Sequence, residues 1–173
     1  AYFGYGFKDH TWKYGAGLDM KLSEKRTSIF RVDYSDDVFA AGRISTALWD
    51  NPMKLKDLGV DLYNANFYQS KKFGASFLYD VSNSLTAKIG LNHENQNALF
   101  DYQYQNLGNS FKNVSTTVSL KFSPNDKNMM TPSGKLTYEK KFPQFFLNYE
   151  FGSKLFDGEL NYHRLDALAI HQF

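Results

Sequence analysis

The stretch from Trp12 to Leu22 constrains the fold more than any other part of the chain, because its residue types alternate strictly. Its even positions are all apolar: Trp12, Tyr14, Ala16, Leu18, Met20 and Leu22. Lysine, glycine and aspartate occupy the odd positions between them. A period of two predicts a β-strand with one apolar and one polar face. The stretch exceeds the roughly five to six residues of a usual strand and matches the about nine to eleven that a tilted strand needs to cross a bilayer.

Similar alternation recurs along the chain, with short polar turns at 23–27 and 81–84. We expect about nine to eleven strands and no helix longer than a turn or two. Short links between successive strands favour an antiparallel up-and-down meander. Open sheets of this size tend to curl or close. The sequence therefore predicts an all-β chain, with residues 1–173 forming a single transmembrane β-barrel domain or a segment of one.

One region interrupts the alternation of apolar and polar residues, and we expect a longer loop there at about 36–59. Residues 38–49 could form a short helix capped by Asp36 or Asp37 and ended by Asn51 and Pro52. Two interpretations stay open: a surface loop with one helical turn, or a segment that enters an interior or docks a partner through Trp49. Farther along, residues 98–105 predict an aromatic strand, and 123–134 predict a loop.

Composition excludes several classes of protein. The net charge is +2 with scattered basic residues, so nothing indicates nucleic acid binding, and there is no cysteine for disulfides or thiolate metal sites. No run approaches the roughly 18 apolar residues of a spanning helix, which leaves a barrel as the way to cross a membrane. The opening residues 1–7 are strand-like and lack a charged signal region. We expect the chain to be an internal piece of a longer protein.

Alternation alone does not show which face of the sheet contacts water. A soluble barrel turns its apolar face inward and could bind an apolar ligand, whereas a membrane barrel turns that face toward lipid. Uniformly apolar strand faces, with aromatic residues near the strand ends, favour the membrane orientation. The residues then expected to face the membrane are Trp12, Tyr14, Leu18, Met20, Leu22, Phe30, Val32, Tyr34, Val118, Leu120, Phe122, Phe145, Leu147 and Tyr149. Those expected to face the interior are Lys13, Asp19, Lys21, Arg31 and Asp33.

No set of residues has the spacing of a catalytic, cofactor or metal site, so the chain is not expected to be an enzyme. The four histidines are dispersed: His10, His93, His163 and His171. Besides the membrane barrel and the soluble barrel, a barrel protease or acyltransferase is a further hypothesis. It needs carboxylates or a Ser/His pair clustered at one rim, and the dispersed histidines count against it. Asp36, Asp37 and Asp126 could bind calcium weakly, but capping of turns is the simpler role.

Two segments also resemble a known family. Residues 5–15 (Tyr-Gly-Phe-Lys-Asp-His-Thr-Trp-Lys-Tyr-Gly), followed by Phe30-Arg-Val-Asp-Tyr34-Ser-Asp36, resemble a Bacteroidota outer-membrane family. Its members place a carboxypeptidase-regulatory-like domain ahead of a barrel related to BamA-type barrels. Residues 158–166 resemble a later strand of that barrel.

The resemblance implies the bacterial outer membrane as location and a structural or accessory role in an envelope complex for outer-membrane biogenesis or transport. The partners it implies are membrane lipid or lipopolysaccharide and other outer-membrane subunits. The sandwich domain and the closing strands of that family are not found in this sequence, which fits a barrel fragment.

Overall fold

The structure is a computed structural model that describes residues 1–6, 11–23, 26–40, 66–101, 108–131 and 134–171. These residues form ten strands and one 3-10 turn. The strands are β1 (Tyr2–Gly6), β2 (Thr11–Lys21), β3 (Ser28–Ala40), β4 (Phe67–Asp80), β5 (Leu85–Ala98), β6 (Ser110–Phe122), β7 (Lys127–Thr131), β8 (Gly134–Glu139), β9 (Gln144–Ser153) and β10 (Tyr162–Ile170). The 3-10 turn η1 (Leu155–Asp157) precedes β10.

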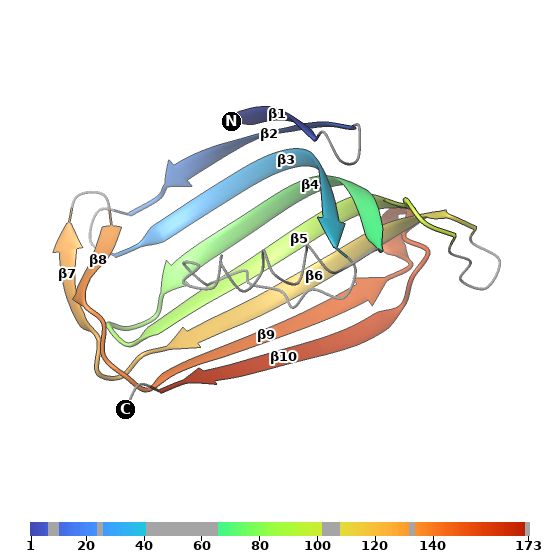
Figure 1. The fold of residues 1–173 in the computed structure, drawn as a ribbon. Coiled ribbons are helices and arrows are strands. Elements are labelled where there is room, and N and C mark those ends of the chain that lie inside the picture. Colours follow the sequence, from blue (N-terminus) through green and yellow to red (C-terminus); the bar gives the residue numbers. More distant parts are fainter. Residues whose placement is uncertain (7–10, 24–25, 41–65, 102–107, 132–133, 172–173) are drawn as a thin grey trace.

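Eight of the strands form one sheet in the order β1-β2-β3-β4-β5-β6-β9-β10, and every neighbouring pair is antiparallel (Figure 1). The remaining two, β7 and β8, pair with each other in a separate hairpin between β6 and β9. The predicted all-β antiparallel meander of about nine to eleven strands is therefore confirmed. Within the described residues, β1 and β10 are the two edges of the sheet.

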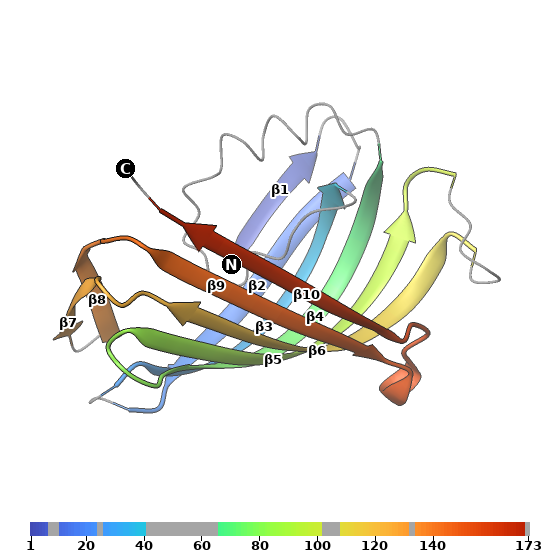
Figure 2. The same cartoon turned by 90° about the horizontal axis from the view of Figure 1, so that it is seen from below.

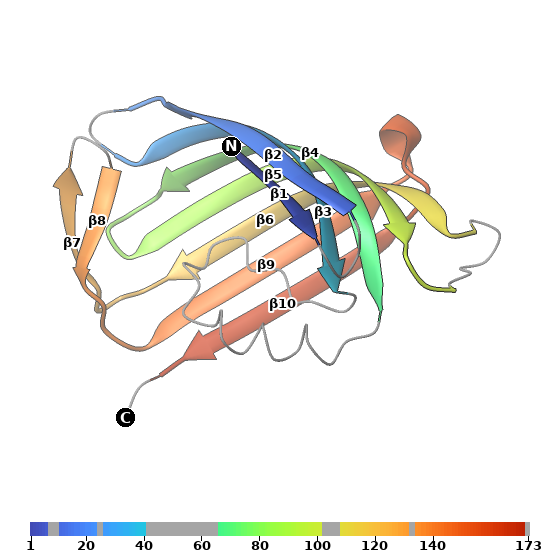
Figure 3. The ribbon, with the colours of Figure 1, turned by 45° about the horizontal axis from the view of Figure 1, so that its top comes forward.

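The eight-stranded sheet is strongly curved rather than flat, as the views from below and from the tilted top show (Figures 2 and 3). Its strands run side by side around an arc, and β10 lies on the opposite side of that arc from β1. One end of the sheet carries the turns 22–27 and 81–84 and the β7–β8 hairpin, and we call it the short-turn end. At the other end lie the last residues of β1, β3, β5 and β9, and we call it the long-connection end because β3 ends at Ala40 and β4 begins only at Phe67.

The long loop expected at about 36–59 is wrong for residues 36–40, and residues 41–59 lie outside the described residues. Residues 36–40 continue β3 and pair in register with 67–71 of β4. The short helix expected over 38–49 is therefore wrong for Val38, Phe39 and Ala40, and its remainder lies outside the described residues. Asp36 and Asp37 lie within β3 itself, where Asp36 accepts a hydrogen bond from Gln69 and Asp37 accepts one from Tyr2.

Two other boundaries differ from the sequence expectation. Polar residues 93–97 belong to β5, which ends at Ala98, so the expected strand over 98–105 does not begin there. Residues 102–105 of that expectation lie outside the described residues. The loop expected over 123–134 contains β7, which pairs with β8.

Candidate functional site

The register of the sheet aligns apolar residues into a row that crosses seven strands. Paired residues in antiparallel strands lie on the same face. The row reads Met20, Phe30, Phe77, Ile89, Val118, Tyr149 and Leu165, one residue each from β2, β3, β4, β5, β6, β9 and β10. Because the row is continuous, the apolar stripes predicted for separate strands form a single surface.

The residues predicted to face the membrane all lie on this apolar face, and most of them are exposed. Leu18 is 68% exposed and Met20 is 51% exposed, although both are mid-strand residues. Val32 and Leu120 are partly exposed. The others are also exposed: Trp12, Tyr14, Leu22, Phe30, Tyr34, Val118, Phe122, Phe145, Leu147 and Tyr149.

No apolar core of ordinary size lies behind that face. Phe146 is the one large apolar side chain that is buried among the described residues, whereas the buried polar side chains include Ser70, Ser119, Asn113 and Asn148. The apolar face is therefore the outer surface of the sheet.

The neighbouring row, one residue along each strand, is polar or glycine throughout. It reads Asp19, Arg31, Ser76, Gly90, Thr117, Glu150 and Arg164. Within it, the Arg31 guanidinium donates two hydrogen bonds to Asp19, with Nε to Oδ1 at 2.5 Å and Nη2 to Oδ2 at 2.6 Å. All five residues predicted to face the interior lie on this polar face, where Lys13 also approaches Asp37 to 3.9 Å.

The polar face is the crowded, inner side of the curved sheet. A Cβ added at Gly15 would lie 2.5 Å from the Tyr2 ring, and one added at Gly152 would lie 2.2 Å from the Tyr162 ring. On the same face, Tyr162 donates a hydrogen bond to Glu150 at 2.7 Å and accepts one from Asn113 at 2.9 Å. Side chains converge on the inner side of a curved sheet, so small residues are needed there.

Aromatic side chains concentrate at the borders of the apolar face. Toward the long-connection end, Trp12 contacts Phe3 and Tyr5 at ring-centroid distances of 5.0 and 4.9 Å. At the opposite border, Phe122 stacks on Phe145 at 6.3 Å. Trp12 and Phe122, which the sequence placed near strand ends, therefore border this face, as interfacial girdles do in membrane barrels. Tyr34 and Tyr138 were also expected near strand ends, but Tyr34 lies in the middle of β3 and Tyr138 belongs to the β7–β8 hairpin.

Beyond the long-connection border, the outer face becomes polar. The register joins Tyr14 to Asp36, Lys71, Asn95 and Lys112 in one row. Asp36 accepts a hydrogen bond from Gln69 at 2.8 Å and lies 3.8 Å from the Lys71 ammonium. The apolar surface is thus a band of limited height and does not run the full length of β3 to β6.

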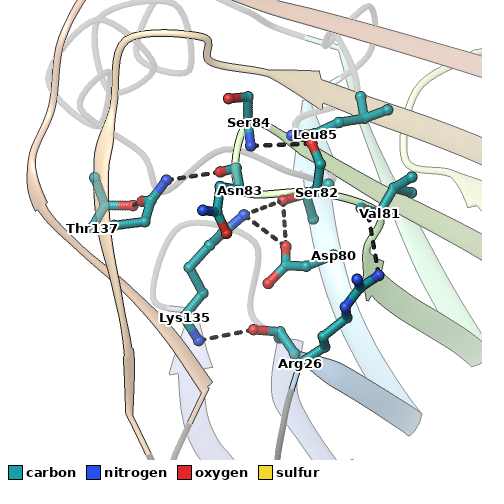
Figure 4. A network of polar contacts seen from close by, with 12 residues as sticks. Arg26, Asp80, Val81, Ser82, Asn83, Ser84, Leu85, Lys135 and Thr137 are labelled. Atoms are coloured by element: carbon teal, nitrogen blue, oxygen red, sulfur yellow. Dashed lines mark hydrogen bonds and ion pairs between the residues drawn. The ribbon is translucent and has the colours of Figure 1, made fainter.

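At the short-turn end, the β7–β8 hairpin contacts the polar face through hydrophilic groups (Figure 4). Lys135 Nζ lies 2.8 Å from Asp80 Oδ1 and 2.9 Å from Thr86 Oγ1. The sequence pattern did not identify this contact, because Asp80 and Lys135 are far apart in the chain and each belongs to an unremarkable polar segment.

One ion pair of the hairpin is exposed and shifts the acidity of its members. Lys127 and Glu139 lie 2.7 Å apart, and Lys141 approaches the same carboxylate to 3.4 Å. The hydrogen bond from Lys127 is the main reason that the pKa of Glu139 lies below its ordinary value. The same bond raises the pKa of Lys127.

The residues considered for chemistry from the sequence stay apart. His93 is in β5 and His163 is in β10, where its Nδ1 lies 2.6 Å from the Tyr149 hydroxyl. His10 lies outside the described residues. Asp126 accepts hydrogen bonds from the Lys141 backbone amide and from Gln144. Within the described ranges, no three His, Cys, Asp or Glu side chains are grouped to hold a metal ion.

No helix in the described part of the chain has the length and apolar character needed to span a membrane.

Comparison with known proteins identifies one family. No curated protein and no solved structure matches the chain. A family model described as the C-terminal domain of a family of unknown function, DUF5686, matches residues 1–173. The chain therefore belongs to the DUF5686 family and corresponds to its C-terminal domain.

Proposed function

We propose that this chain is an integral β-barrel segment of the bacterial outer membrane, acting as a structural or accessory subunit of an envelope complex for biogenesis or transport. The observation that carries the proposal is the pair of adjacent rows across the sheet. The apolar row from Met20 to Leu165 is on the outside, and the polar row from Asp19 to Arg164 is on the inside.

A lipid bilayer is the environment that best fits this distribution of apolar and polar side chains. In water, an exposed apolar band of this extent favours aggregation, whereas lipid tails solvate it. The backbone groups inside the sheet are paired between strands, which is the condition for β-structure in a bilayer. The aromatic borders at Trp12 and Phe122 would then lie at the two membrane interfaces.

The two ends of the sheet support an orientation in the membrane in which the short-turn end faces the periplasm. Membrane barrels of this class have short turns toward the periplasm and longer loops toward the outside. The turns 22–27 and 81–84 would then be periplasmic. The polar outer row with Asp36, Lys71 and Lys112 would lie at headgroup level in the outer leaflet, where it would meet lipid or lipopolysaccharide.

The edges of the sheet support a role within a larger assembly. Within the described residues, β1 and β10 each have one neighbouring strand, and β1 pairs only with residues 11–15 of β2. An unpaired strand edge is costly in a bilayer. We therefore propose that further strands, from the same protein or from another outer-membrane subunit, complete the barrel wall.

The alternative, a soluble barrel that binds an apolar ligand, is less well supported. Such a barrel would enclose Leu18, Met20 and Val118, and these side chains are 68%, 51% and 41% exposed. No enzymatic role is proposed.

Membrane fractionation of the protein tests the proposal. We expect it in the outer-membrane fraction, extracted by detergent but not by high salt or alkali, with a gel mobility that changes on heating. Recovery in the soluble fraction without detergent, with no mobility change on heating, would end the proposal.

A further inference from the structure

We propose that the β7–β8 hairpin is a hinged strap that is latched onto the polar inner face by Asp80 and Lys135. Release of this latch would uncover the short-turn end of that face. The inference depends on side-chain contacts and not on the membrane location, so the two can fail separately.

The strap contacts the ends of neighbouring strands of the main sheet, near β3, β4 and β5, without joining the sheet. Near the tip of the hairpin, the Lys135 backbone amide donates a hydrogen bond to Thr27 Oγ1 at 2.8 Å, at the start of β3. Farther back, Asn128 Nδ2 donates one to the Asn83 carbonyl at 2.8 Å, in the turn between β4 and β5. Neither strand of the hairpin is hydrogen-bonded into the eight-stranded sheet.

Among the side chains that the structure describes, those of the strap that contact the sheet are polar. Met129, Leu136 and Tyr138 are 52%, 52% and 62% exposed, so these apolar side chains do not anchor it to the sheet. Attachment through a few hydrogen bonds and one ion pair makes local opening easier than for an element with a buried apolar face.

The ion pair between Lys135 and Asp80 is well shielded from water. The Lys135 side chain is 14% exposed and the Asp80 side chain is 7% exposed. Thr86 Oγ1 donates a hydrogen bond to the same Asp80 oxygen at 2.6 Å. Because both charges are largely removed from solvent, loss of either one leaves its partner uncompensated, which favours the open position.

The latch is also incompletely satisfied when closed. Asp80 Oδ2 is buried without a hydrogen-bond partner in the described structure. An unpaired carboxylate oxygen is costly, and opening would return it to water. The closed strap is therefore stabilised by the Lys135 contact and opposed by this oxygen, as expected for an element with two accessible positions.

Labelling of a covered position tests the latch in the full-length protein. Thr27 is 8% exposed beneath the strap, so Thr27→Cys introduces a covered thiol into a chain that has no cysteine. The substitution replaces the hydroxyl that accepts the Lys135 amide hydrogen bond with a weaker acceptor, so every variant is compared with the Thr27→Cys protein. We expect Asp80→Asn or Lys135→Met to raise its labelling rate by a polar maleimide about tenfold, the change that corresponds to roughly 1.4 kcal/mol. Lys127→Met, which removes only the exposed pair within the hairpin, should leave the rate unchanged.

A charge exchange separates release of the strap from general loss of folding. The double variant Asp80→Lys, Lys135→Asp should label more slowly than either single variant, while far-ultraviolet circular dichroism reports an intact sheet in all of them. Equal labelling rates for Asp80→Asn, Lys135→Met and Lys127→Met would overturn the inference. Fast labelling of the Thr27→Cys protein without a second substitution would overturn it as well.

Discussion

Asp19 and Met20 are consecutive residues of β2, yet they begin two rows of opposite character that run across seven of the eight strands of the sheet. Met20 pairs with Phe30, and Asp19 pairs with Arg31. Because side chains of a strand alternate between faces, a one-residue step along the chain changes the surroundings from apolar to ionic. The proposed membrane location depends on this relationship.

Substitution of Met20 by arginine should destabilise the protein far more than a charged substitution on the other face. A charge on the lipid side near the middle of a bilayer costs about 2–4 kcal/mol. Lys21→Arg keeps its charge on the polar face and should have almost no effect. Urea unfolding in lipid vesicles measures both, and equal unfolding free energies for the two variants would contradict the prediction.

The Asp19–Arg31 pair should contribute little stability despite its two short hydrogen bonds. The side chains of Arg31 and Asp19 are 51% and 49% exposed, so water screens the interaction. Exposed pairs contribute about 0–1 kcal/mol. A double-mutant cycle with Asp19→Asn and Arg31→Met measures the coupling. A coupling energy several times larger would mean that the interior is dry.

Gly152 should tolerate no side chain, because the Tyr162 ring occupies the space. An added Cβ would lie 2.2 Å from that ring, so Gly152→Ala should cost about 1–3 kcal/mol. Gly4→Ala is the matched control, since nothing lies within 4 Å of its added Cβ. Tyr162→Ala should largely remove the cost of Gly152→Ala. Equal unfolding free energies for the Gly152 and Gly4 variants would contradict the crowding.

The sequence predicted the strands whose two faces differ most. Regular alternation over 12–22, 114–122 and 145–151 indicated β2, β6 and β9, and their apolar residues share one face. The predictions were less accurate for segments in which both faces of the strand are polar. Residues 93–97 of β5 offer no alternation to detect, and the consecutive aspartates of β3, Asp36 and Asp37, have the composition of a turn.

Contacts between segments far apart in the chain could not be predicted from local residue patterns. Asp80 ends β4 within a polar turn, and Lys135 belongs to a segment whose alternation is short. Only the folded arrangement brings them to 2.8 Å. Similarly, the alternation in the sequence changes phase after Tyr162, although β10 pairs with β9 in continuous register. The misleading signal is Tyr162, an aromatic residue on the polar face.

Glu139 should recover a more ordinary acidity when its partner is removed. The Lys127 hydrogen bond lowers the pKa of Glu139, so this pair stabilises the hairpin above the ordinary carboxyl pKa, and its contribution is lost as pH falls through the lowered value. In Lys127→Met, the pKa of Glu139 should rise, and Lys141 should keep it somewhat lowered. Carbon-13 NMR titration of the glutamate carboxyl groups measures the shift, and an unchanged pKa would contradict it.

The most direct test of the membrane proposal is the accessibility of spin labels placed one at a time at Leu18, Asp19, Met20 and Lys21 in lipid vesicles. We predict high oxygen and low nickel-chelate accessibility at Leu18 and Met20, and the reverse at Asp19 and Lys21, because alternate residues would meet lipid and a hydrated interior. Nickel-chelate accessibility that is as high at Leu18 and Met20 as at Asp19 would contradict the proposal.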